Sequence, residues 1–171
     1  MSPLSQNVTI TTTDVAGINF IAIAPVIGRT NWKIIYFDSQ ETVCGNYAAV
    51  NAIDGNVNSF WHTQYCGATP GMPHEIQIDL GATYAISGFQ YLPRQDGGTN
   101  GDVNAYNFFV STDGTNWNPV SSGNLITAAS DHSLKQVTFP SFTGRYVRFQ
   151  ALSDVNSSPY ANVTELNVLG H

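Results

Sequence analysis

The chain has 171 residues, enough for one domain with a sizeable core; 42% are hydrophobic and only 11% are charged. Asn, Thr, Ser and Gly fill the place of the missing charges, and these are residues of turns and short strands. A net charge of −6 and a pI near 4.8 argue against nucleic acid and anionic membranes as partners, so a neutral ligand fits better.

Two apolar or alternating runs open the chain and predict strands over 7–13 and 18–24. A break at "PVIGRTN" (25–31) separates this N-terminal extension, 1–31, from a main domain over 32–171. We expect the extension to form a hairpin or arm. Because an apolar strand is a liability as a free edge, the arm either extends the main sheet or joins two copies as a dimer or higher oligomer.

The main domain consists of short apolar or alternating runs separated by turn residues, a pattern typical of β-sandwiches. In "HEIQIDL", for example, Ile76, Ile78 and Leu80 alternate with polar residues. The "DG" of "STDGTNW" predicts a hairpin turn, followed by Trp117, which we expect to close the core. Residues 46–55 have room for one helical turn. The predicted strands are 32–39, 74–80, 85–93, 105–113, 135–140, 145–152 and 164–170.

Cys44 and Cys66, the only cysteines, lie in polar, loop-like sequence. A pair is compatible with one disulfide, with two free thiols or with a chance occurrence, and the residues alone do not choose among these. A structural zinc site needs more ligands of this kind.

Seven motifs in order suggest a family: "WKIIYFDSQET", "AIDGNVNSFWHTQY", "HEIQIDLG", "YLPRQDGGTNG", "FFVSTDGTNW", "RYVRFQAL" and "NVTELNVLG". This succession resembles the discoidin domain, also called the coagulation factor V/VIII type C domain. Within that family it is most similar to the galactose-binding family 32 carbohydrate-binding modules, such as the N-terminal domain of galactose oxidase. The resemblance covers nearly all of 32–170. It implies an all-β jelly-roll sandwich of about eight main strands, a structural cation and a sugar site.

The segment "AIDGNVNS" groups oxygen-bearing side chains around a glycine. A hard cation such as calcium prefers six to eight oxygen ligands. Asp54 would supply a charged ligand, and Asn51, Asn56 and Ser59 would add carbonyl or hydroxyl oxygens. The alternative is a plain turn in which Asp54 binds its own backbone. The resemblance favours calcium, or sodium, as a structural ion and implies two further ligands on the last strand, Thr164 and Glu165.

A galactose-type sugar has an axial 4-hydroxyl and a continuous apolar patch, so its recognition requires an aromatic ring and a few fixed polar groups. In "FWHTQY", strand alternation places Trp61 and His62 on opposite faces. If Trp61 enters the core, His62 points away from it. The resemblance implies that His62 contacts the sugar and that the aromatic three residues later, Tyr65, contributes a stacking face.

Four further sugar contacts follow from the resemblance. Arg94, after an apolar strand, offers a rigid fork of donors, although Asp96 could simply hold it in a surface ion pair. Asn100 matches an asparagine of the family's site. Tyr160 would form a second aromatic wall, or else pack on the end of the sandwich. Glu41 matches an acidic position that some relatives use for a hydroxyl contact.

The expected function is therefore non-catalytic binding of glycans that end in galactose or N-acetylgalactosamine. Catalysis is disfavoured because none of the four histidines accompanies a nucleophile motif. Two alternatives are phospholipid binding, which the acidic charge disfavours, and protein binding by an adhesion domain of this type. No signal peptide is visible, although such a function would suit an extracellular location.

Overall fold

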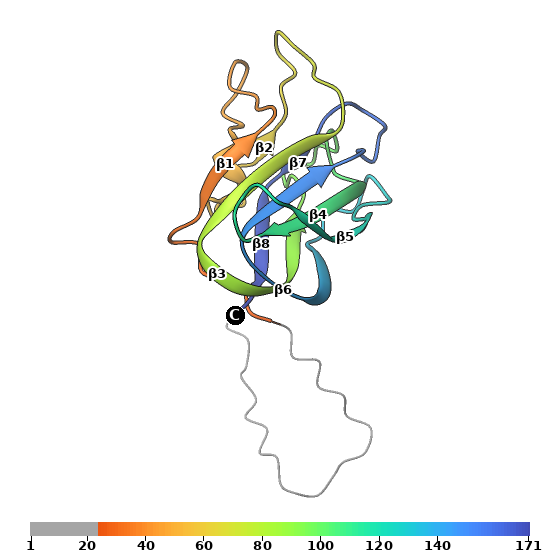
Figure 1. Ribbon diagram of the computed structural model, residues 1–171. Coiled ribbons are helices and arrows are strands. Elements are labelled where there is room, and N and C mark those ends of the chain that lie inside the picture. The colour runs from red at the N-terminus through yellow and green to blue at the C-terminus, as the bar shows by residue number, and fades with distance from the viewer. Residues whose placement is uncertain (1–23) are drawn as a thin grey trace, which may run out of the picture.

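The computed structural model describes residues 24–171, and in this range the chain is almost entirely β-structure (Figure 1). The all-β prediction is confirmed, and one 3-10 turn, η1 (Ala49–Ile53), forms inside the predicted helical segment. No helix among the described residues is long and apolar enough to cross a membrane. The strands are β1 (Lys33–Phe37), β2 (Trp61–His62), β3 (His74–Leu92), β4 (Ala105–Ser111), β5 (Asn118–Asn124), β6 (Lys135–Ala151), β7 (Asn162–Val163) and β8 (Glu165–Gly170).

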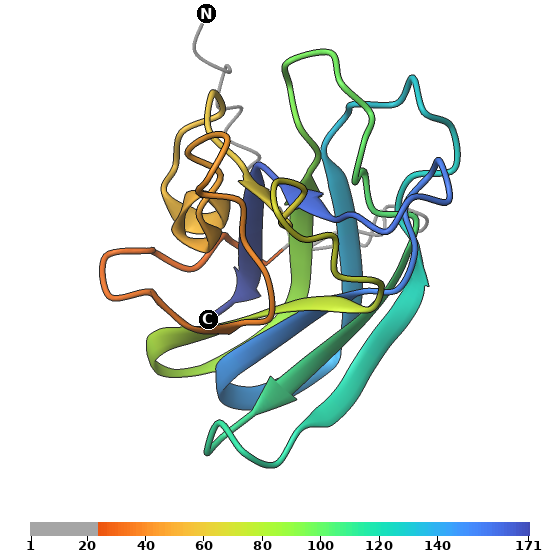
Figure 2. The same cartoon turned by 90° about the horizontal axis from the view of Figure 1, so that it is seen from above.

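The two long strands β3 and β6 run side by side and build both layers of the sandwich. Their pairing is interrupted between Asp79 and Tyr84, and Figure 2 shows both strands bending there. One half of the pair continues into β1 on one side and β4 and β5 on the other. The other half pairs with β8. Sequence patterning predicts four separate strands here, 74–80, 85–93, 135–140 and 145–152, because each half has its own apolar pattern and a polar bend lies between them.

The core lies between these layers, and alternation fills it. Ile76, Ile78 and Leu80 are fully buried while the residues between them are half-buried, as the sequence predicted. Phe89 from one layer stacks on Phe108 from the other, with ring centroids 4.4 Å apart and planes 9° apart. The layers are therefore joined by direct aromatic contact.

Strand β5 and Trp117 differ from the sequence prediction. Strand β5, "NPVSSGN", is an edge strand and largely exposed. Its sequence therefore lacks the apolar alternation that indicates a strand, and the sequence analysis did not predict it. Trp117 does not enter the core. It is half-buried on the surface, where the guanidinium of Arg148 lies 5.2 Å from its ring centre.

The described part of the predicted N-terminal extension packs on β8. The amide of Ile27 donates to the carbonyl of Val168 at 2.9 Å, and that of Gly170 donates to Pro25 at 3.0 Å. The Ile27 side chain is 4% exposed and joins the core. The predicted strand 7–13, nearly all of 18–24 and the predicted oligomer contact lie outside the described residues.

Candidate functional site

Strand β2 directs two neighbouring side chains in opposite directions, as strand alternation predicted. Trp61 is fully buried, and its indole nitrogen donates to the carbonyl of Ser39 at 2.8 Å. His62 pairs with Asn162 of β7 and turns its ring toward a surface hollow. The core position of Trp61 therefore fixes the direction of His62.

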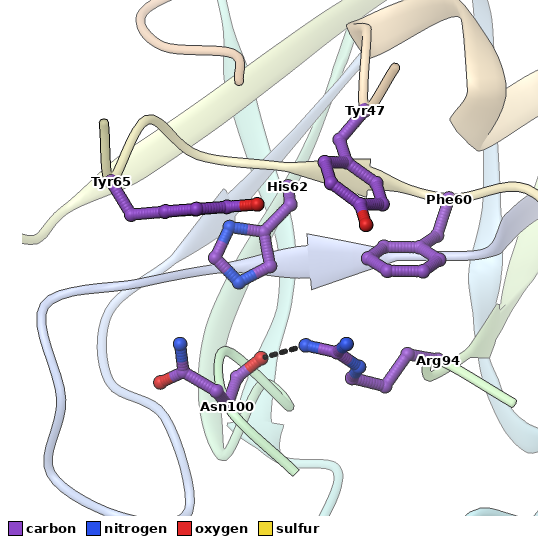
Figure 3. Close-up of a pocket in the computed structure, with 6 residues that line it drawn as sticks. All are labelled: Tyr47, Phe60, His62, Tyr65, Arg94 and Asn100. Carbon is purple, nitrogen blue, oxygen red and sulfur yellow. Dashed lines mark hydrogen bonds between the residues drawn. The ribbon is translucent and has the colours of Figure 1, made fainter. Parts of the chain in front are cut away.

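The hollow has a volume of about 150 Å³ and is open to solvent (Figure 3). Three segments that are separate in the sequence meet around it. Four of the six predicted sugar contacts line it, and two aromatic residues that the sequence analysis did not assign to it complete the wall. The lining residues are Tyr47, Phe60, His62, Tyr65, Arg94 and Asn100.

His62 is held in one tautomer. Its Nδ1 lies 2.6 Å from the carbonyl oxygen of Thr63, which can only accept, so Nδ1 carries the proton. Burial lowers the pKa of His62, and the charge of Arg94 lowers it further; the backbone carbonyls of Thr63 and Asn100 and the charge of Glu41 oppose this shift without reversing it. The neutral ring therefore leaves Nε2 as a hydrogen-bond acceptor.

Arg94 lies opposite His62 in Figure 3. Its guanidinium forms two hydrogen bonds to Asp96, at 2.7 and 2.6 Å, so the ion pair that was the alternative to a sugar contact is present. Nη1 donates to the carbonyl of Asn100 at 3.3 Å, and the guanidinium lies 4.7 Å from the centre of the Phe60 ring. These contacts fix the orientation of the guanidinium at the edge of the hollow.

Aromatic rings surround His62 on several sides. The Tyr65 ring meets it edge-on, with centroids 5.3 Å apart, and the Tyr160 ring lies 5.5 Å away, although Tyr160 is outside the set that lines the hollow. Tyr47 packs on Phe60 at 4.7 Å. Sequence reasoning assigned neither Tyr47, which lies in an irregular loop, nor Phe60 to the site. The only signal for either was its aromatic character.

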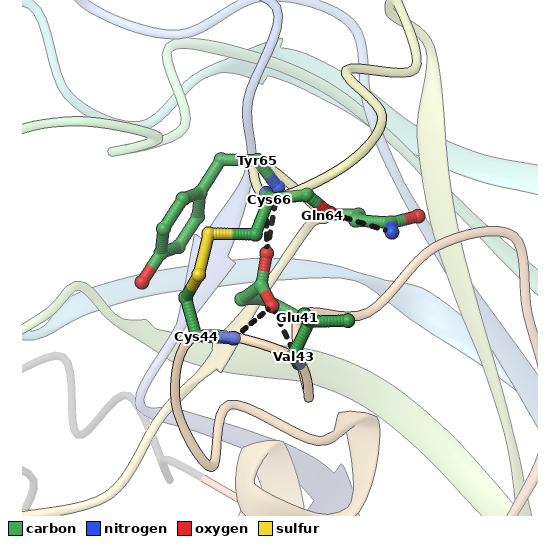
Figure 4. The surroundings of a disulfide bond; sticks show 6 residues. All are labelled: Glu41, Val43, Cys44, Gln64, Tyr65 and Cys66. Atoms are coloured by element: carbon green, nitrogen blue, oxygen red, sulfur yellow. Dashed lines mark hydrogen bonds between the residues drawn. A yellow bond between two sulfur atoms is a disulfide. The ribbon is translucent and has the colours of Figure 1, made fainter.

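Glu41 lies beneath the hollow and not in it. Its side chain is fully buried, and each carboxylate oxygen accepts two backbone N–H bonds: Val43 and Cys44 donate to one oxygen, Tyr65 and Cys66 to the other, all at 2.7–2.9 Å (Figure 4). A carboxylate enclosed in this way cannot reach a ligand. The predicted sugar contact of Glu41 is therefore wrong, and its carboxylate instead holds the two loops beneath the hollow together.

These bonds decide the charge of Glu41. Burial alone would raise its pKa, but the N–H donors more than offset this and lower the pKa from 4.5 to about 2. Cys44 and Cys66, which carry two of the donors, form a disulfide with Cα atoms 6.0 Å apart. Of the alternatives for the two cysteines, the structure selects the covalent one.

In the segment predicted to bind a cation, Asp54 forms the hydrogen-bonded turn that was the alternative interpretation of this sequence. One oxygen of the exposed Asp54 accepts the amide of Asn56 at 2.8 Å, and the other accepts the hydroxyl of Ser59 at 2.7 Å. The amide nitrogen of Asn51 donates to the carbonyls of Asn46 and Phe60. The loop is thus well ordered by its own hydrogen bonds.

The partner strand supplies buried oxygens without partners. Thr164 and Glu165 are 0% and 4% exposed, and Oγ1 of Thr164 and Oε1 of Glu165 accept no hydrogen bond. Burial raises the pKa of Glu165; the nearby Asp54 adds to this and Arg29 opposes it. Within residues 24–171, no three His, Cys, Asp or Glu side chains cluster. The atoms that could coordinate a metal are nevertheless oxygens, and Oγ1 of Thr164 and Oε1 of Glu165 accept no hydrogen bond. This set of atoms fits a hard cation such as calcium.

Comparison with known proteins identifies related domains. The F5/8 type C domain profile matches residues 36–166. The chain is 39% identical to a sialidase of Micromonospora viridifaciens over 91% of its length, and 38% identical to galactose oxidase of Gibberella zeae over 85%. It spans only 24% and 21% of these proteins. Among solved structures, it resembles a family 32 carbohydrate-binding module of Clostridium perfringens in complex with GalNAc-β-1,3-galactose. The two share 35% identity and a TM-score of 0.76 over 85% of this chain and 100% of that one.

The buried carboxylate of Glu41 generates a prediction about stability. Replacing Glu41 with Gln turns an NH₂ group toward backbone donors and lowers the unfolding temperature. Because the pKa of Glu41 is depressed, its contribution is complete above pH 4.5 and is lost as the pH falls toward 2. The difference in unfolding temperature between wild type and Glu41→Gln should therefore become smaller as the pH falls over this range, as measured by thermal unfolding followed by circular dichroism.

Glu75→Gln, on the outer face of β3, controls for the loss of a carboxylate as such. A difference in unfolding temperature between wild type and Glu41→Gln that stays constant from pH 6 to pH 2.5 would contradict the structural role of the Glu41 carboxylate.

Proposed function

The chain belongs to the F5/8 type C domain family, and on that basis we propose that it binds glycans ending in galactose or N-acetylgalactosamine without altering them. The observation that carries the proposal is the composition of the hollow, where a neutral histidine, an oriented arginine and an asparagine converge beside aromatic rings. The bound disaccharide of the clostridial module supports the choice of sugar.

The polar groups complement a sugar hydroxyl, which both donates and accepts. Nε2 of His62 accepts one hydroxyl proton, while Arg94 donates to a hydroxyl oxygen. An axial 4-hydroxyl in this corner satisfies both groups at once. The Asn100 amide can donate or accept at a neighbouring hydroxyl. An equatorial hydroxyl, as in glucose, points elsewhere and leaves these groups unpaired, which is costly once they are desolvated.

The aromatic rings receive the apolar side of the sugar. The rings of Tyr65 and Tyr160 both lie close to the His62 ring, with centroids 5.3 and 5.5 Å from it, and the C–H patch of a galactose-type ring can pack on one of them. Tyr47 and Phe60 form the opposite wall. A volume of about 150 Å³ suits one terminal sugar with the rest of the glycan in solvent.

The proposed role is binding and not hydrolysis. Glycoside hydrolysis uses a pair of carboxyl groups across the bond that is cleaved. The six side chains around the hollow include no carboxylate, and Asp96, beside it, is engaged by Arg94. A shallow site of this kind binds weakly by itself, so high avidity comes from several sites acting together.

We further propose a structural calcium ion, for which sodium could substitute, held by Asp54 and Glu165 with oxygens of Asn51, Asn56, Ser59 and Thr164. When bound, the ion supplies positive charge that joins the loop before β2 to β8. Support comes from the unpartnered buried oxygens of Thr164 and Glu165. The ion stabilises the scaffold and does not contact the sugar.

Removing either polar group from the hollow should reduce sugar binding. His62→Ala and Arg94→Ala each leave a sugar hydroxyl unpaired, which costs at least about tenfold in affinity for galactose. Isothermal titration calorimetry with galactose and N-acetylgalactosamine measures this, with glucose as the non-binding sugar. Arg145→Ala, which breaks an ion pair with Asp79 away from the hollow, should bind like wild type.

Wild-type affinity in both His62→Ala and Arg94→Ala would refute the site. If the protein binds neither sugar but sediments with phosphatidylserine vesicles, the lipid-binding alternative is favoured.

Affinity should also depend on pH through His62. Its lowered pKa keeps the ring predominantly neutral at pH 7 and above, so galactose affinity should change little from pH 8 to pH 7. At lower pH, protonation of Nε2 removes the acceptor and places a second charge beside Arg94, so affinity falls. Titrations at half-unit steps test this; an affinity that rises on acidification contradicts the acceptor role.

The calcium proposal predicts a shift in stability. Calcium at about 100 times its dissociation constant adds roughly 2.7 kcal/mol. For a domain of this size, that raises the unfolding temperature by on the order of 5–10 °C over protein in chelator. Differential scanning calorimetry in calcium and in EGTA measures the shift, and coincident transitions would argue against the ion.

A further inference from the structure

The cation loop already holds a positive charge from the chain itself. Nη1 of Arg29 lies 2.8 Å from Oε2 of Glu165, and Nη2 donates to the side-chain oxygen of Asn167. A Cβ placed on Gly55 would lie 3.3 Å from Nη1, so the guanidinium also lies against the Asp54–Gly55 turn. It therefore sits between the two chain segments that the proposed ion would join.

Arg29 is a feature of this chain's N-terminal part. It precedes residues 36–166, the range matched by the family profile. The segment that carries it is anchored, because Ile27 is buried and its amide bonds to β8. The guanidinium is thus delivered to Glu165 by a fixed backbone and not by a free tail.

The local charges explain why an arginine is stabilised there. Glu165 is 4% exposed and lies near the negative Asp54, so an unpaired carboxylate would be costly. Arg29 neutralises one oxygen. It leaves Oε1 of Glu165 and Oγ1 of Thr164 without partners, so the guanidinium balances the charge but does not satisfy every oxygen.

We propose that Arg29 is a built-in counter-ion that competes with calcium for Glu165. A divalent cation on this carboxylate and a guanidinium 2.8 Å from it repel each other, so the ion binds fully only when the Arg29 side chain moves away. Arg29 thereby stabilises the metal-free domain and weakens its affinity for calcium. This inference rests on the calcium part of the proposed function and is independent of the sugar part.

The test compares wild type with Arg29→Gln, which keeps a polar side chain of similar reach but removes the charge. In EGTA, Arg29→Gln should unfold at a lower temperature than wild type. In calorimetric titrations with calcium chloride, it should bind calcium on the order of tenfold more tightly, because the competing charge is gone. Arg148→Gln, on the outer face of β6 against Phe109 and Trp117, is the matched control and should keep wild-type calcium affinity.

If Arg29→Gln binds calcium and wild type does not, the result supports the proposal in its strongest form. Equal or weaker calcium affinity in Arg29→Gln would overturn it. If neither protein binds calcium, both the ion and the competition are refuted, whereas galactose titration of the same samples reports separately on the sugar site.

Discussion

The buried carboxylate of Glu41 is the interaction on which the hollow depends. It gathers four backbone N–H groups from two loops that the Cys44–Cys66 disulfide also joins. Its own backbone connects to both neighbours, since its amide donates to His62 and its carbonyl accepts from Tyr47. Three residues that line the hollow are thus tied to Glu41, Tyr65 through its carboxylate and Tyr47 and His62 through its backbone. The surface on which a weak sugar ligand would rest is organised before any ligand arrives, which limits the entropy lost on binding.

Much of this could be predicted from sequence because it depends on local periodicity. The alternation of "FWHTQY" separates Trp61 from His62. Arg94 and Asn100, which line the hollow, were assigned through the family resemblance and not through periodicity. The role of Glu41 could not be predicted, since its donors lie up to 25 residues away and belong to the backbone, which leaves no trace in residue identity. Strand β5 was missed because its exposed sequence lacks apolar alternation, and the surface position of Trp117 was missed because its neighbour Arg148 comes close only through the fold.

Charge is distributed differently at the two proposed sites. The hollow combines a neutral histidine with an arginine that Asp96 already compensates, which suits an uncharged ligand. The loop before β2 faces β8 with Asp54 and the buried Glu165, and Arg29 balances part of that charge. Phe60 connects the two regions: its ring packs under Arg94, and its carbonyl accepts from Asn51 near the loop. A change in the loop can thereby alter the wall of the hollow without touching the sugar.

The central claim is that a galactose-type sugar binds in the hollow around His62. The most direct measurement is an NMR titration of the isotope-labelled protein with galactose, followed at the backbone amides and the His62 ring. The account predicts that the largest shifts occur at His62, Tyr65, Arg94 and Asn100, with glucose causing little change at the same concentration. Shifts that cluster elsewhere, such as the polar hollow formed by Trp32, Asp79 and Arg145, or equal responses to both sugars, would contradict it.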